Sequence, residues 1–416
     1  DGTRVLDITD PTNLQEIAYY DMSEVEGLYV SNWGVYAYLP SGYIISSDIE
    51  QGLFVLELGG VSILHDDITD IDVESDGPYI NFSASVESFT GDVDEVTLHY
   101  SIDNNNWNEL SMTYSGNSNI YNVVYTPDQE GIIIYYYITA TNTEGQFSVY
   151  PNNGDDYVLF VYGNLEDLVV QSFENDNSWY VESDASSGIW ELVVPNPTYD
   201  DGVLAQTDID HSENGEKCFI TGNDEIENDS GQDDVDGGTT TLYSNTYNLS
   251  TFDNVLLTYW RWYTNNLGNN PGTDFWVVQA SSDDGENWTD LENTNQSNPA
   301  WQQERFVLNE YINLTEEVQF RFVASDLSYP GDVGSGGSLV EAALDDFMLE
   351  AIAYDSQLGD VNFDGSIDVI DIIMIVNIIL DNIEATESQL IASDINSDGS
   401  IDVTDIINLV NIILNN

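Results

Sequence analysis

Two copies of one acidic segment, 34 residues apart, constrain the fold of this chain most strongly. GDVNFDGSIDVID at 359–371 recurs as SDINSDGSIDVTD at 393–405, and each copy leads into a segment rich in isoleucine and valine. In both copies, oxygen-bearing side chains stand at loop positions 1, 3, 5, 9 and 12, with glycine at position 6. This is the ligand spacing of a calcium loop, in which position 7 contributes its backbone carbonyl.

The spacing therefore predicts two calcium sites. The predicted ligands of the first loop are Asp360, Asn362, Asp364, the Ser366 carbonyl, Asp368 and Asp371. Those of the second loop are Asp394, Asn396, Asp398, the Ser400 carbonyl, Asp402 and Asp405. Two solvated acidic turns are the alternative, but carboxylates that repel one another in a duplicated register favour a bound cation. A helix–loop–helix EF-hand is a further alternative, although residues 355–359 are too few for its entering helix and position 12 is Asp rather than Glu.

These loops resemble those of type I dockerins, in which two loop–helix repeats are joined by a middle helix, here expected at 384–393. The resemblance covers residues 358–416 and predicts a small helical domain at 357–416. It implies docking onto a cohesin or a neighbouring module through the repeat helices. In cellulosomal dockerins, Ser/Thr pairs are usual at 369–370 and 403–404, where this chain differs. The residues expected to contact a partner are Val369, Ile370, Ile373, Val376, Val403 and Thr404.

The charge of the chain restricts its partners and its environment. The sequence has 76 acidic and five basic residues, a net charge of −71, so nucleic acid and anionic membranes are repelled. Such a surface suits a saline or calcium-rich extracellular environment. The single cysteine, Cys218, excludes an intrachain disulfide, and no run of 18 apolar residues is present to insert into a membrane. We interpret the chain, which lacks an initial methionine and a signal sequence, as a mature or truncated piece of an exported protein.

The first 60 residues predict about four short strands, within EIAYYDM, GVYAYLP, YIISSDI and LFVLEL. GTRVLDITDPTNLQEIAYYD resembles the repeats of LVIVD-type propeller proteins. The match amounts to one blade, so residues 1–60 are expected to form a partial domain. This partial domain is expected to pack on the next domain, on another chain or on further blades.

Longer strands separated by turn residues follow at 68–163, in YINFSASVES, DEVTLHYSID, NIYNVVYTP, GIIIYYYITATN and DYVLFVYG. This segment resembles a fibronectin-III or immunoglobulin-like β-sandwich, expected to act as a spacer.

The largest unit, at 165–353, alternates apolar and polar residues in KCFITG, TTTLYSNTYNL, NVLLTYWRWYTN, DFWVVQASSDD, EVQFRFVASD and EAALDDFMLE. Its pattern predicts a jelly roll and resembles the MAM-like, concanavalin-type sandwiches of bacterial exported proteins. The resemblance implies one or more structural calcium ions, with Glu174 and Asp345 or Asp346 as ligands and Asp234 and Asp236 as further candidates. Solvated acids remain the alternative. The predicted fold class is thus mainly β, with tandem sandwiches and a small all-α calcium-binding domain.

The sequence does not indicate an enzyme. Its three histidines, His65, His99 and His211, lie outside HExxH spacing, and GxSxG, CxxC and phosphate-loop motifs are absent. With 76 acids, a pair of carboxylates carries no information about glycoside hydrolysis.

Two functions stay open. The first is a calcium-stabilised structural or adhesive protein that docks to partners or to copies of itself, head to tail, in a fibre or surface layer. The second is a carbohydrate-binding accessory protein, or the non-catalytic part of a secreted enzyme anchored through a cohesin. In YWRWYTNN, alternation places Trp260 and Trp262 on one face and Tyr259, Arg261 and Tyr263 on the other. One aromatic pair is expected in the core and the other as a sugar-stacking platform, unless both pack under loops.

Overall fold

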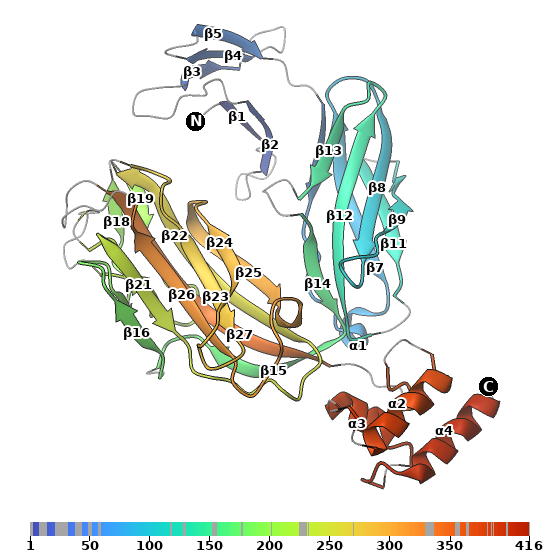
Figure 1. Cartoon of the computed structure of the whole chain (residues 1–416). Coiled ribbons are helices and arrows are strands. Elements are labelled where there is room, and N and C mark those ends of the chain that lie inside the picture. The colour runs from blue at the N-terminus through green and yellow to red at the C-terminus, as the bar shows by residue number, and fades with distance from the viewer. Residues whose placement is uncertain are drawn as a thin grey trace. The chain divides into compact units, whose positions relative to one another are not determined.

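The computed structural model describes most of the chain. The described residues are 3–7, 15–20, 32–37, 44–48, 52–56, 60–116, 119–127, 130–151, 156–175, 178–200, 202–223, 231, 233–268, 270–328, 337–353, 358–362, 366–380, 382–383, 385, 387–396 and 398–415. The predicted fold class is confirmed: the structure is mainly β, and its longer helices lie at the C-terminus (Figure 1). The chain divides into two compact units, 1–164 and 165–416. None of the described helices is long and apolar enough to cross a membrane.

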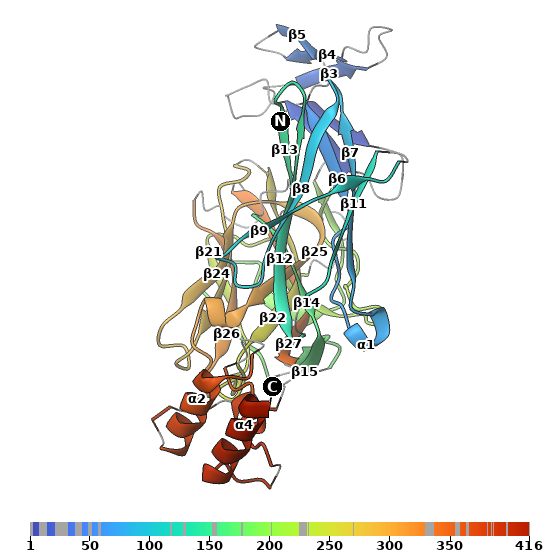
Figure 2. The same cartoon turned by 90° about the vertical axis from the view of Figure 1, so that its right-hand side faces the viewer.

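The first unit begins with two small sheets, whose strands β1 to β5 are labelled in Figure 1; Figure 2 shows β3, β4 and β5 from another side. One pairs β1 with β2, and the other has the order β3-β4-β5. Their bounds are β1 Thr3–Asp7, β2 Gln15–Tyr20, β3 Asn32–Tyr36, β4 Ile44–Asp48 and β5 Gly52–Leu56. The Thr3 and Ser46 hydroxyls, 2.7 Å apart, join the two sheets. The sequence prediction missed β1, and whether these strands belong to an LVIVD-type blade stays a prediction.

A β-sandwich completes the first unit. Its sheets have the orders β10-β11-β7-β6 and β13-β12-β8-β9, with β14 beside β12. The bounds are β6 Val61–His65, α1 Val73–Asp76, β7 Ile80–Ser88, β8 Val93–Ser101, β9 Asn108–Ser111, β10 Thr113–Tyr114, β11 Ile120–Tyr125, β12 Ile132–Asn142, β13 Phe147–Tyr150 and β14 Val158–Tyr162. Alternation along β7 buries Ile80, Phe82, Ala84 and Val86, as expected for a strand with one face on the core.

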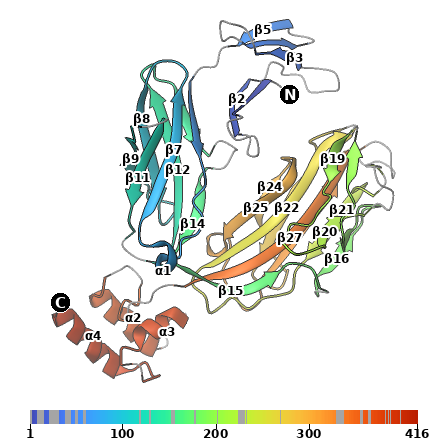
Figure 3. The same cartoon turned by 180° about the vertical axis from the view of Figure 1, so that it is seen from behind.

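The second unit contains a larger sandwich. Its sheets have the orders β17-β20-β27-β22-β25, with β15 beside β27, and β16-β21-β26-β23-β24; β18 and β19 form a separate hairpin. The bounds are β15 Asn164–Gln171, β16 Tyr180–Ser183, β17 Trp190–Val193, β18 Thr198–Asp200, β19 Val203–Gln206, β20 Cys218–Thr221, β21 Gly238–Tyr243, β22 Val255–Gly268, β23 Trp276–Ser281, β24 Thr289–Thr294, β25 Asn298–Val307, the 3-10 helix Leu308–Glu310, β26 Gln319–Asp326 and β27 Ser338–Ala353. The long strands β22 and β27 run side by side (Figure 3).

A buried charged network joins the two sheets of this sandwich. Arg261 on β22 contacts Glu292 on β24, with 2.8 Å between Nε and Oε1, and Glu304 on β25, with 2.8 Å between Nη2 and Oε1. The second oxygen of Glu292 accepts hydrogen bonds from Tyr259 Oη (2.7 Å) and Trp276 Nε1 (2.8 Å). The β22 side chains therefore reach across the core to the opposite sheet.

The C-terminal helices pack on a small apolar core. They are α2 Val369–Ile379, α3 Glu387–Ser393 and α4 Val403–Asn415. Among the described residues, the fully buried apolar side chains of this core are Val361, Ile375, Ala392 and Leu409. The described part of the middle helix begins at Glu387, whereas we expected it from residue 384, which lies outside the described residues.

Candidate functional site

The last aspartate of each acidic loop closes that loop in the same way. Asp371 is fully buried, and its Oδ1 accepts from the amides of Val361 (2.9 Å) and Asn362 (3.2 Å) while its Oδ2 accepts from Asp368 N (2.8 Å). In the second loop, the buried Asp405 accepts from Asn396 N (3.3 Å) and Asp402 N (2.9 Å). Position 12 therefore fixes positions 3 and 9 of both loops.

In the second loop, further side-chain oxygens accept hydrogen bonds from amides of the same loop. Asp394 accepts from the amides of Asp398 (3.0 Å) and Gly399 (2.8 Å), and Asn396 Oδ1 accepts from Asp398 N (2.9 Å). Gly399 has a φ of 81°, which a residue with a side chain rarely adopts. In the first loop Asp360 is buried, whereas Asp364 lies outside the described residues.

Each loop also starts the helix that follows it. Asp368 Oδ1 accepts from Ile370 N (2.7 Å), and Asp402 Oδ1 accepts from Thr404 N (2.6 Å). These bonds cap the first turns of α2 and α4. The hydrogen bonds from Thr404 lower the pKa of Asp402. The position of each helix thus depends on the shape of its loop.

The donor set of the two loops suits calcium, because every predicted ligand is an oxygen of a carboxylate, an amide or a backbone carbonyl. Within the described part of the chain, no three His, Cys, Asp or Glu side chains are already gathered as a metal-binding group.

The repeat helices expose apolar side chains at equivalent positions. Val369 (61% exposed) and Ile373 (54%) on α2 correspond, 34 residues later, to Val403 (61%) and Ile407 (55%) on α4. We call these four residues the repeat ridge. Of the other residues expected to contact a partner, Ile370 and Thr404 are exposed and Val376 is half-buried. The sequence analysis missed Ile407, although the repeat spacing from Ile373 indicates it.

Glu174, Asp210 and Asp345 lie around Cys218, whose pKa is raised by burial and by these three carboxylates. Glu174 Oε1 accepts from the amides of Glu216 (2.9 Å) and Lys217 (3.0 Å). Asp210 Oδ2 is buried without a hydrogen-bond partner. Sequence reasoning missed Asp210, because nothing in its local pattern relates it to Glu174.

The two adjacent aspartates of β27 have different surroundings. Asp345 is fully buried, accepts from the amides of His211 (2.8 Å) and Ser212 (3.2 Å), and has a pKa raised to about 7, chiefly by burial. Asp346 contacts His211 Nδ1 at 2.6 Å. The structure therefore brings Asp345, but not Asp234 or Asp236, into the group of charges around Cys218.

One of the two aromatic pairs of YWRWYTNN lies in the core, as expected, and one ring of the other pair is covered, so Trp260 alone stays a candidate for a sugar platform. Tyr259 and Tyr263 are fully buried in the core, as the strand alternation allows. Trp262 is only 4% exposed because the β18–β19 hairpin covers it, and its Nε1 donates to Ala205 O (2.8 Å). The ring of His211 stacks on the half-buried Trp260, with 3.7 Å between the ring centroids.

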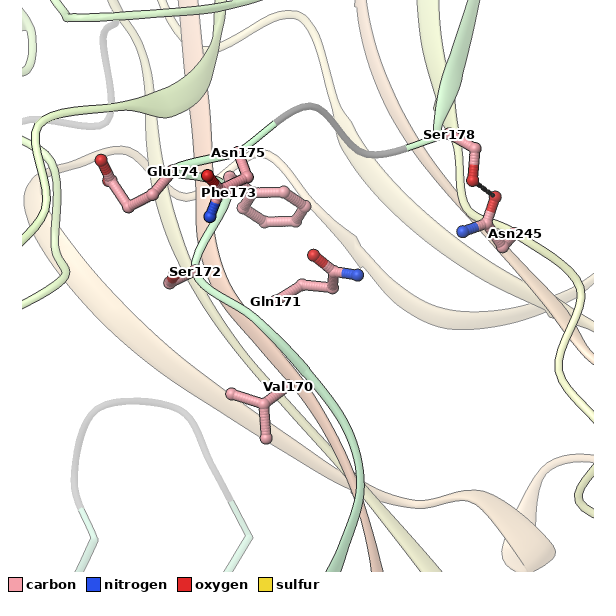
Figure 4. A pocket seen from close by; sticks show the side chains of 8 residues that line it. All are labelled: Val170, Gln171, Ser172, Phe173, Glu174, Asn175, Ser178 and Asn245. Carbon is pink, nitrogen blue, oxygen red and sulfur yellow. Dashed lines mark hydrogen bonds between the residues drawn. The ribbon is translucent and has the colours of Figure 1, made fainter.

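A pocket of about 560 Å³ opens beside the end of β15 (Figure 4). Its lining includes the amide side chains of Gln171, Asn175 and Asn245. Ser178 donates to Asn245 Oδ1 (2.7 Å), and this pair stands across the pocket from Glu174 (Figure 4).

Comparison with protein families identifies the C-terminal segment. Residues 358–414 match the family model of the dockerin type I domain. This dockerin segment contains both acidic loops and the three helices α2, α3 and α4 up to residue 414. No curated protein matches the chain.

Several solved structures share weak similarity with the chain. The K1 cleaved adhesin domain of Lys-gingipain from Porphyromonas gingivalis W83 is 16% identical, with 46% of this chain and 100% of that chain covered and a TM-score of 0.29. A family 11 carbohydrate-binding module of a cellulosomal cellulase from Clostridium thermocellum is 9% identical, with 46% and 95% covered and a TM-score of 0.25. These values support no argument about function.

Proposed function

We propose that this protein is extracellular and that its C-terminal calcium-binding dockerin segment docks the β-sandwich domains onto a protein partner. The observation that carries the proposal is the repeat ridge, where apolar side chains stay exposed at equivalent positions of two helices. Exposed apolar groups that recur in one register indicate a contact surface, whereas isolated ones need no explanation.

Calcium controls the docking surface in this proposal. The loop aspartates Asp368 and Asp402 cap the helices that carry the ridge, and Asp371 and Asp405 close the loops. A bound ion at each loop would neutralise its clustered carboxylates and so stabilise the first turns of α2 and α4. We therefore expect docking to need calcium.

Binding of the full chain to a panel of immobilised cohesins tests the proposal, with and without a calcium chelator. Binding is expected only with calcium, and the variant Ile373→Asp/Ile407→Asp should lose it because both repeats lose their ridge. Val124→Asp, at an equally exposed position of β11, is the matched control. Equal binding by the double variant would show that the repeat ridge is not the docking surface. Light scattering would show whether a second copy of the chain binds to the ridge instead of a cohesin.

The proposal extends to a calcium ion in the jelly roll, held by Glu174, Asp210 and Asp345. It is supported by Asp210 Oδ2, which is buried without a hydrogen-bond partner, and by the proximity of all three carboxylates to Cys218, on whose pKa their charges act. Gly215 lets Asp210 and Glu174 approach each other, because a Cβ at this position would lie 2.2 Å from Asp210 Oδ2 and 2.4 Å from Glu174 Oε1. Oxygen-coordinated density at about 2.3–2.6 Å in a calcium-soaked crystal would verify this site.

Carbohydrate binding is the second candidate function. It is favoured by the amides that line the pocket beside β15, since side-chain amides hydrogen-bond to sugar hydroxyls. A glycan array probed with the full chain tests this function, and Gln171→Ala is the variant that should weaken any signal.

A further inference from the structure

Four aspartates of the jelly roll, Asp234, Asp236, Asp274 and Asp326, are each at most 3% exposed. They are remote from the carboxylates near Cys218. Val235 N donates to Val340 O, which is five residues along β27 from Asp345. Five residues of extended strand span about 16 Å. The second unit therefore contains two separate groups of acids, and only this second group is buried throughout.

Strand register brings the four aspartates together. Asp326 ends β26, where it is paired with Gly238 of β21, two residues after Asp236. On the other side of β26, Ala324 is paired with Trp276 of β23. Continuing that register by two residues places Asp274 beside Asp326. Three chain segments thus contribute acids to one position at the edge of the core.

Neither carboxylate oxygen of Asp326 makes a hydrogen bond of good geometry, although the residue is fully buried and interacts with the backbone of Gly237 and with Asp274. The hydroxyl of Tyr263, also fully buried, makes no hydrogen bond of good geometry, although it interacts with Asn265. It lies close enough to Asp274 and Asp326 for their charges to act on it. By contrast, Asp274 is held in place: its Oδ1 accepts from the amides of Leu327 (2.9 Å) and Ser328 (3.1 Å). A buried carboxylate without good hydrogen bonds is costly, so a missing ligand is indicated.

The charges that act most strongly on Asp234 and Asp326 are those of neighbouring carboxylates. Burial raises the pKa of Asp234 to about 8, and repulsion from Asp236 and Asp326 adds to the effect. Burial likewise raises the pKa of Asp326 to about 7, with repulsion from Asp274 next in size. A cation among these carboxylates would reverse the balance, because it replaces repulsion with coordination.

We propose that Asp234, Asp236 and Asp326 bind one divalent cation of the calcium class, while Asp274 positions Asp326. The donors are oxygens only, and Tyr263 Oη adds a further oxygen at the site. The carboxylates are not yet gathered at ligand distances, so binding would draw them together. The ion would join the segment before β21 to the end of β26 and thereby stabilise that edge of the core.

Calcium content and thermal unfolding of the full chain test this site. After dialysis against calcium, Asp326→Asn should retain one ion fewer per chain than the unchanged protein. Asp167→Asn, which removes the same charge from an exposed position of β15, should retain them all. The rise in melting temperature on adding calcium should also be smaller in Asp326→Asn.

In chelator, Asp326→Asn should melt at the same temperature as the unchanged protein or higher, because it removes a repulsive charge. Should Asp326→Asn fail to fold, Asp234→Asn provides the same measurements. An unchanged ion count together with an unchanged calcium-induced shift overturns the proposal and shows that the aspartates share protons instead.

Discussion

At the scale of single residues, the buried Arg261 is the side chain whose loss we expect to destabilise the jelly-roll core. It is 5% exposed and faces two glutamates, one from each sheet of the jelly roll. Its removal would leave Glu292 buried without its cationic partner. Buried ion pairs contribute little net stability, but breaking one of them is expensive.

We predict that Arg261→Met lowers the free energy of unfolding of the jelly roll by about 3–5 kcal/mol. Urea denaturation at fixed calcium measures this, followed by tryptophan fluorescence, since most of the nine tryptophans lie in residues 165–353. Arg261→Met/Glu292→Met should recover part of the loss, because both charges are then absent. Arg4→Met, at an exposed position, should change stability by less than about 0.5 kcal/mol. A loss below about 1 kcal/mol for Arg261→Met would show that Glu292 is solvated or protonated.

At the scale of elements, the loop–helix repeat is the unit that we expect to depend on metal. The loops share one hydrogen-bonding scheme. Their helices meet over a core in which four of the described apolar side chains are fully buried. A core of that size contributes little free energy of folding to offset the repulsion among the loop carboxylates.

We predict that removing calcium unfolds α2, α3 and α4 while the β-sandwiches persist. The circular dichroism signal at 222 nm should fall, because nearly all described helical residues belong to these three helices. Asp371→Ala/Asp405→Ala should show the low signal even with calcium, and the exposed-site variant Asp167→Ala should not. A helical signal that is insensitive to chelator would contradict the prediction.

At the scale of the whole molecule, the large negative net charge is the feature expected to affect stability most. A net charge of −71 opposes the compact state through self-repulsion. The Debye length falls from about 10 Å at 0.1 M salt to about 3 Å at 1 M, so added salt screens most of this repulsion.

We predict that 1 M sodium chloride raises the calcium-free melting temperature by roughly 5 °C or more relative to 0.1 M. An uncharged osmolyte at the same osmolality is the control for solvent effects other than screening. Equal effects of salt and osmolyte would mean that the self-repulsion is small.

The sequence alone determined the features that are encoded locally. The twelve-residue register identified the dockerin segment, which the family match supports, and the alternating strands predicted a mainly β fold. Alternation also placed Tyr259 and Tyr263 on one face of β22, and it would have placed Asp326 in the buried row of Phe320, Phe322 and Ala324. These inferences work because the periods of loops and strands are fixed by backbone geometry.

The tertiary structure decided which distant residues meet. Strand pairing placed Asp326 beside the segment that contains Asp236, and the turn around Gly215 brought Asp210 to Glu174. It also covered Trp262 with the β18–β19 hairpin, which is one of the two alternatives that the strand pattern left open. With 76 acids in the chain, local sequence cannot indicate which carboxylates become neighbours, because their proximity depends on sheet order and register rather than on spacing along the chain.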